Sequence, residues 1–116
     1  MQVNGKQLDL DIFELNTAER FENAVKEVAK QMQEMKEKEL SLADSIRLQC
    51  EAIADCFDAL WGEGAAYRIF DGRVNLKLAL QSFEDLMKGA AAQKEDMKLL
   101  VRSFEDTRLH GETEES

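Results

Sequence analysis

The stretch Trp61-Gly62-Glu63-Gly64-Ala65-Ala66-Tyr67-Arg68-Ile69-Phe70-Asp71-Gly72 stands between two segments that have helical patterns. It holds three of the eight aromatic residues and three of the six glycines of the chain. Gly62 and Gly64 can take the left-handed backbone conformations that end a helix and redirect the chain. We therefore expect a tight corner, pinned by aromatic rings, that serves either as architecture or as a partner-binding edge.

Two amphipathic helices are predicted before the corner, over 17–38 and 42–61. In the first, apolar residues recur at gaps of three and four, the spacing of a heptad seam. These positions are Ala18, Phe21, Val25, Val28, Met32 and Met35. Asn16 or Thr17 should begin this helix, with Asn16 and Glu19 as a capping box. The second, capped by Ser41, has a wider apolar face, and the short connection predicts antiparallel packing.

The segment after the corner predicts a short helix over 65–70 and a last helix over 75–108, capped by Asn75. Gly89 lies inside this last helix and favours a bend or a break there. Beyond Gly89 the apolar spacing resumes at Met97, Leu100, Val101 and Phe104. The acidic residues 109–116 are expected to form a disordered tail.

The first residues differ from the rest. Asn4-Gly5 is a hairpin turn signal, and Leu8, Leu10 and Ile12 alternate with polar residues as in a half-buried strand. We therefore expect a β element over 2–13. The fold class is then mainly α: a small antiparallel helical bundle with a short N-terminal β strand or hairpin, forming one domain over 1–108. The expected core is Leu10, Phe21, Val25, Val28, Ile46, Ile53, Phe57, Leu60, Leu80 and Phe83.

The composition disfavours several functions. A net charge of −9 argues against direct binding of nucleic acid. No apolar run reaches the ~18 residues of a membrane span, and the N-terminus has no signal-peptide pattern. Cys50 and Cys56 lie about 240° apart on one predicted helix and cannot bond to each other, so we read them as reduced and the protein as cytoplasmic.

Groups that could perform chemistry are few. His110, the single histidine, lies in the acidic tail without support from neighbouring structure. Glu51, Asp55 and Asp58 share one side of a predicted helix and are the best metal candidate, but they read better as a solvated face. We expect no enzymatic activity, no cofactor and no metal.

Several motifs together resemble a family of small proteins from the tail-gene regions of phages and prophages of Gram-positive bacteria. They are Val3-Asn4-Gly5-Lys6 with Leu8-Asp9-Leu10, then Cys56-Phe57-Asp58-Ala59-Leu60-Trp61, then the corner through Phe70, then Asn75-Leu76 and Phe83-Glu84. The resemblance covers about residues 1–88. Such proteins look like tail assembly chaperones, which implies a helical, tape-measure-type protein partner that must stay soluble before assembly.

Two other classes stay open: an acidic phage inhibitor of a host defence enzyme, and a structural homo-oligomer. The edge strand and the narrow heptad seam predict a homodimer or larger assembly. The expected partner-binding residues are the corner rings Trp61, Tyr67 and Phe70, or otherwise the end of the first helix at Met32 and Met35.

Overall fold

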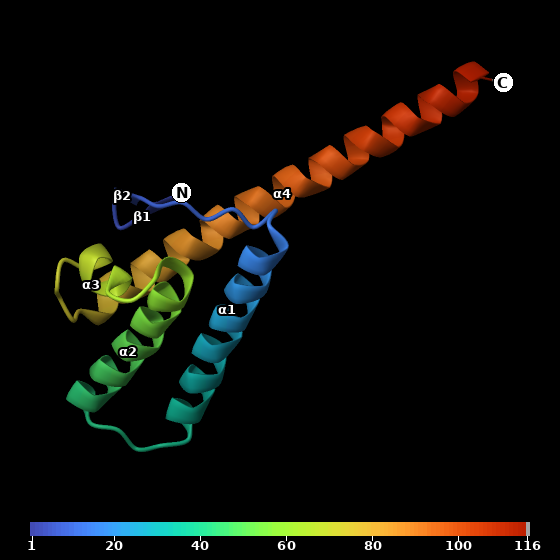
Figure 1. Cartoon of the computed structure of the whole chain (residues 1–116). Helices are drawn as coiled ribbons and strands as arrows, with labels where there is room; N and C mark the ends of the chain where they lie inside the picture. Colours follow the sequence, from blue (N-terminus) through green and yellow to red (C-terminus); the bar gives the residue numbers. More distant parts are fainter. Residues whose placement is uncertain (116) are drawn as a thin grey trace.

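Two antiparallel helices and one long helix that crosses their ends make up most of the molecule (Figure 1). The computed structural model describes the backbone of residues 1–115 and the side chains of residues 1–108. The long helix passes the N-terminal segment and the first turn of α1, and its distal half then projects with no other described element beside it. The molecule is therefore elongated, at 70 × 31 × 21 Å. The elements are β1 (Gln2–Val3), β2 (Lys6–Gln7), α1 (Leu15–Lys36), α2 (Leu42–Trp61), α3 (Ala65–Ile69) and α4 (Leu76–Glu115).

The predicted fold class is confirmed: the chain is mostly helical, with a short N-terminal hairpin. Two predicted helix starts are also confirmed. The Ser41 hydroxyl accepts a hydrogen bond from the Asp44 backbone N–H at 3.1 Å, which caps α2. The Asn75 side-chain oxygen accepts from the Leu78 N–H at 3.0 Å at the start of α4. Each cap satisfies one of the backbone donors that a helix leaves unpaired at its N-terminus.

The predicted start of α1 is wrong. The helix begins at Leu15, with Glu14 as the N-cap residue and without a side-chain cap. The chain has already turned before Asn16, because the Asp11 carboxylate accepts a hydrogen bond from the Phe13 N–H at 3.0 Å. The first helical bond follows at once, from the Ala18 N–H to the Glu14 carbonyl at 2.9 Å. The predicted capping box at Asn16 therefore lies inside the first turn.

The predicted β element over 2–13 is shorter than expected. β1 and β2 pair antiparallel, with Val3 opposite Lys6, around the Asn4-Gly5 turn. The ladder ends at Gln7, but the predicted alternation continues as a pattern of burial. Leu10 and Ile12 are buried, whereas Asp9 and Asp11, which alternate with them, are exposed. The reason is that this segment lies against α4 and finds its hydrogen bonds there instead of in a further strand.

The core sits where α2 meets α1, α3 and α4. Six predicted core residues are buried: Leu10, Phe21, Val28, Ile53, Phe57 and Leu60. Three more pack against them half-buried: Val25, Ile46 and Phe83. Leu80 was predicted to be buried and is 45% exposed, because it lies at the open edge of a groove. The core also takes in Val3, Ile12, Ile69, Phe70 and Leu86, which were not in the predicted set.

Gly89 does not interrupt α4, which runs from Leu76 to Glu115. A Cβ atom at Gly89 would lie 2.9 Å from the Met1 Cε atom, so this glycine lets the N-terminal residue lie close against the helix. The last helix was predicted to end at 108, whereas α4 continues to Glu115. The predicted disorder over 109–116 falls on residues whose side chains lie outside the described part of the chain, so it stays a prediction.

Candidate functional site

The corner between α2 and α4 is built by backbone capping. Gly62 ends α2 at φ +97°, and its N–H donates to the Asp58 carbonyl at 2.8 Å. The Asp58 carboxylate then accepts from the Ala66 N–H at 2.9 Å, near the start of α3. A carboxylate in this place satisfies a free N–H and complements the positive end of the helix. Asp58 therefore holds the corner, which gives it a structural role outside any metal site.

The three corner rings lie in different environments. Phe70 is 6% exposed, and its ring centroid lies 5.5 Å from that of Phe57, so the ring is buried in the core. Trp61 is half-buried, packs edge-on against Phe57 at 5.7 Å, and donates from Nε1 to the Asp9 carbonyl at 2.7 Å. Tyr67 is 73% exposed. Of the three rings, Tyr67 is thus the one whose face is open to a partner.

The exposed Tyr67 ring has a defined position. Gly72 has φ +71°, and a Cβ atom there would lie 2.9 Å from the Tyr67 ring. The Gly72 N–H also donates to the Tyr67 carbonyl at 2.9 Å, as in the turn that commonly ends a helix. The ring therefore lies directly against the Gly72 backbone, on the outside of the corner.

The N-terminal hairpin is joined to the corner by hydrogen bonds and an ion pair. The Asn4 side-chain amide donates to the Ile69 carbonyl at 2.7 Å, and the Lys6 ammonium donates to the same oxygen at 3.0 Å. Lys6 also pairs with Asp71 at 2.9 Å, and the Asn4 N–H donates to Asp85 on α4. Sequence reasoning assigned Asn4 only to its own turn. These partners are more than sixty residues away, so no local pattern could have indicated them.

Met32 and Met35 lie at the end of α1, next to the connection to α2. Both are half-buried and line an open groove, which we call the methionine groove. Its walls are Met32, Met35, Lys36, Lys38, Leu40, Ser45 and Gln49. The groove thus combines two flexible apolar side chains with two lysines.

A second apolar groove adjoins the first at Met32. It opens between α1, α2 and α4 and has a volume of about 310 Å³; we call it the three-helix groove. It is lined by Val25, Val28, Ala29, Met32, Gln49, Ile53, Leu80 and Phe83. Sequence analysis placed most of these residues in the core, since heptad spacing predicts an apolar face and cannot say whether another helix covers it.

The distal half of α4 carries an exposed apolar row, which we call the distal stripe: Met97, Leu100, Val101 and Phe104. Met97 is half-buried, whereas Leu100 is 60% exposed and Phe104 68% exposed. The predicted spacing is present, but among the described residues no other element lies beside the stripe (Figure 1).

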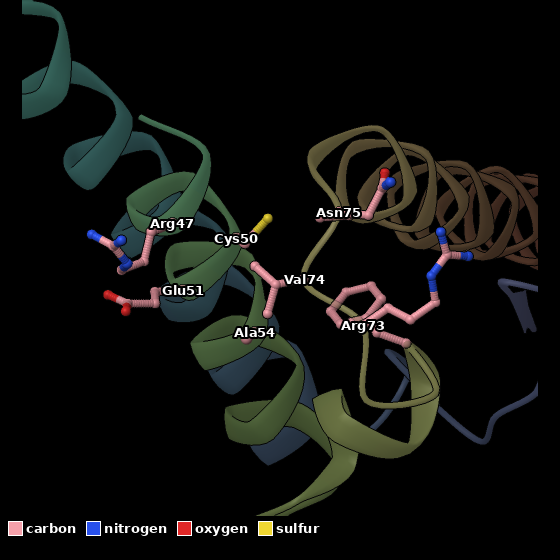
Figure 2. A pocket seen from close by; sticks show the side chains of 9 residues that line it. Arg47, Cys50, Glu51, Ala54, Arg73, Val74 and Asn75 are labelled. Carbon is pink, nitrogen blue, oxygen red and sulfur yellow. The ribbon is translucent and has the colours of Figure 1, made fainter. Parts of the chain in front are cut away.

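A small pocket of about 140 Å³ lies between α2 and the segment that leads into α4 (Figure 2). It is lined by Arg47, Cys50, Glu51, Ala54, Phe70, Arg73, Val74, Asn75 and Ala79. Cys50 and Cys56 are both free and buried, and burial raises the pKa of each thiol, that of Cys56 to about 11. Because the thiolate is the reactive form, neither sulfur is activated as a nucleophile.

Acidic side chains do not converge on a metal centre in the part of the chain that is described: no three His, Cys, Asp or Glu side chains gather there in suitable positions. Partial desolvation raises the pKa of the Asp55 carboxyl, and the negative charges of Asp58, Glu51 and Glu27 raise it further. His110 lies outside the described side chains. No helix within the described residues combines the length and the apolar content that crossing a membrane requires.

The fold and these surfaces define a mainly α protein with a helical hairpin, a long crossing helix and open apolar grooves. Residues 4–114 match a family described as a family of unknown function, DUF6673. The chain belongs to this family. No curated protein and no solved structure matches the chain.

Proposed function

We propose that the protein is a non-enzymatic phage or prophage protein, a tail assembly chaperone-like factor that binds a helical, tape-measure-type partner in the cytoplasm of the host cell. The observation that carries this proposal is the methionine groove. Two half-buried methionines of α1 border an open groove at the end of the α1–α2 hairpin where the two helices are connected. Methionine side chains are flexible and polarisable, so they adapt to many apolar partners.

The chemistry of the groove supports a partner helix of one kind. Lys36 and Lys38 line the groove beside Met32 and Met35. A helix with an apolar stripe and acidic flanking residues fits such a surface, since its side chains fill the groove while its carboxylates meet the lysines. The net charge of −9 supports a holding role, because it keeps a complex with an apolar client soluble. The proposal involves no cofactor, nucleic acid or membrane.

The alternative of an acidic inhibitor of a host defence enzyme has only the net charge in its support. The alternative of a homo-oligomer has the distal stripe in its support and is compatible with a chaperone-like role.

A labelled helical peptide tests the proposal. The probe is an amphipathic peptide with leucines at heptad spacing and glutamates on the flanks, and its binding is followed by fluorescence anisotropy at ~0.15 M salt, where the Debye length is about 8 Å. We expect saturable binding, and we expect Met35→Asp to weaken it at least tenfold. Gln33→Asp is the matched control, because Gln33 is exposed on the same helix and lies outside the groove.

Three results would overturn the proposal: no saturable binding by the wild-type protein, equal binding by Met35→Asp, or stronger binding of the same peptide with lysine flanks. As a second readout, co-expression should keep a tape-measure fragment in the soluble fraction with the wild-type protein and lose that effect with Met35→Asp.

A further inference from the structure

The apolar face of α4 continues past the point where its own chain covers it. Heptad positions on the first part of the helix are packed into the core or against it: Leu76, Ala79, Phe83, Leu86 and Ala90. Gln93, at the next such position, meets the N-terminal segment. The same spacing then places Met97, Leu100 and Phe104 on the projecting half, where the last two are exposed. The apolar row of α4 is thus buried in its first part and exposed in its second part. This pattern indicates that another helical surface packs on the exposed part.

The molecule also has the complementary surface. The three-helix groove lies open between α1, α2 and the first part of α4, and Leu80 at its edge is 45% exposed. An apolar helix face fits such a groove through side chains at three- and four-residue spacing. The distal stripe has this spacing over Met97, Leu100, Val101 and Phe104.

The stripe cannot fill the groove of its own chain. Phe83 in the groove and Leu100 in the stripe belong to one continuous helix. Seventeen residues separate them, so at 1.5 Å per residue they are about 26 Å apart along the axis. Because α4 is not broken between these residues, the stripe stays far from the groove and must be covered by another molecule.

We propose that the distal stripe of one copy docks in the three-helix groove of a second copy, and that two-fold symmetry makes this exchange reciprocal. The area favours this arrangement over pairing of two stripes. Four half-exposed side chains offer roughly 400 Å², whereas a standard interface needs about 800 Å² from each partner. In the reciprocal dimer each copy contributes both its stripe and its groove. The assembly is then a closed dimer, because no stripe or groove is left for a third copy. This inference goes beyond the proposed function, since self-association needs no client helix.

The first test measures the mass of the full chain by sedimentation equilibrium from micromolar to near-millimolar concentration. We expect a dimer, and we expect Leu100→Asp to raise its dissociation constant at least tenfold. Leu99→Asp is the matched control, since it makes the same change at a leucine that is 50% exposed and lies about 150° around the helix from the stripe. It should leave the dissociation constant within about twofold of the wild-type value.

The second test exchanges surfaces between variants. Leu80→Asp in the groove should also weaken the dimer at least tenfold, while Gln81→Asp, on the exposed side of the same helix turn, should not. A mixture of Leu100→Asp and Leu80→Asp can form a heterodimer with one intact contact. The Leu80→Asp chain keeps its distal stripe, and this stripe can enter the unchanged groove of the Leu100→Asp chain. The mixture should therefore form heterodimers at concentrations where each variant alone is monomeric.

Circular dichroism and thermal melting of each variant exclude unfolding as the cause of a lost dimer; if Leu80→Asp is unfolded, Ala29→Glu charges the groove at an exposed position instead. A wild-type monomer at all concentrations overturns the inference. So does a dimer that loses affinity with Leu100→Asp but keeps it with a folded groove variant, because that pattern shows stripe-to-stripe pairing. Met35→Asp should leave the dimer intact, which separates this inference from failure of the client-binding proposal.

Discussion

The side chain of Gln93 on α4 holds the backbone of Ile12 as a neighbouring strand would. Its Oε1 atom accepts from the Ile12 N–H at 2.9 Å, and its Nε2 atom donates to the Leu10 carbonyl at 2.6 Å. One side-chain amide thus supplies the donor and the acceptor that a β ladder would give to this segment. It explains why Leu10 and Ile12 are buried in alternation although the strands end at Gln7.

Replacing Gln93 with leucine should therefore be costly. It keeps an apolar side chain of similar size but leaves one backbone N–H and one carbonyl without partners, at about 1–3 kcal/mol for each group that stays buried. We expect urea denaturation to show a loss of about 2 kcal/mol. Hydrogen exchange of the Ile12 amide should accelerate more than that of amides in α2. Gln81→Leu, at an exposed position of the same helix, should change the stability by less than about 0.5 kcal/mol.

Ser82 should be replaceable by alanine with a gain in stability. It is 1% exposed, and its hydroxyl oxygen has no hydrogen-bond partner among the described residues. Removing an unsatisfied buried hydroxyl and adding the better helix former should together stabilise the fold by about 1 kcal/mol. Thermal melting should show an increase of roughly 4 °C, and the exposed Ser103→Ala should give a much smaller change. A lower melting temperature for Ser82→Ala would mean that the hydroxyl has a stabilising contact.

The raised pKa of the Asp55 carboxyl makes stability depend on pH. The folded state holds the proton of Asp55 more tightly than the unfolded chain does. Ionisation of this carboxyl therefore lowers the free energy of unfolding as the pH rises from the ordinary pKa, about 3.8, to the raised value. At pH 7 the charged form is disfavoured by desolvation and then by Asp58, Glu51 and Glu27. Asp55→Asn should therefore melt at a higher temperature than the wild-type protein at pH 7. The difference should shrink as the pH falls toward the ordinary pKa and disappear below about pH 3, where the carboxyl is protonated in both states.

The matched control for Asp55→Asn is Glu95→Gln on the exposed face of α4, which removes the same charge away from this cluster. If both variants shifted the melting temperature equally, the effect would come from net charge instead of from the surroundings of Asp55.

The parts of the fold that local signals encode could be predicted. α2 was predicted with both of its ends, since Ser41 and Asp44 mark its start and Gly62 marks its end. The partners of Asn4 and Gln93 could not be predicted, because they lie 65 to 83 residues away and leave no spacing pattern. The residues of the three-helix groove and of the distal stripe were predicted as apolar rows, but their exposure was not predicted. Periodicity shows which face of a helix is apolar. Whether another helix packs on that face depends on where the other helices end, as the exposed side chains of Leu80 and Leu100 show.

The corner rings give the last prediction, because sequence analysis left their role open. Trp61→Ala should cost about 2–4 kcal/mol, since it removes the packing on Phe57 and leaves the Asp9 carbonyl without its indole donor. Trp61→Phe should recover most of the packing and isolate the loss of that hydrogen bond, at about 1 kcal/mol. Tyr67→Ala should stay within about 0.5 kcal/mol of the wild-type protein, because its ring is 73% exposed.

Measuring the stability of these variants together with binding of the glutamate-flanked peptide separates architecture from recognition at the corner. A folded Tyr67→Ala protein that binds the peptide as well as the wild type places the client on the methionine groove alone. A folded Tyr67→Ala protein that binds at least tenfold more weakly makes Tyr67 part of the client surface, since its ring is the open one of the three. In contrast, Trp61→Ala should lose peptide binding only in proportion to the fraction that is unfolded, because its ring and its indole N–H are already used within the chain.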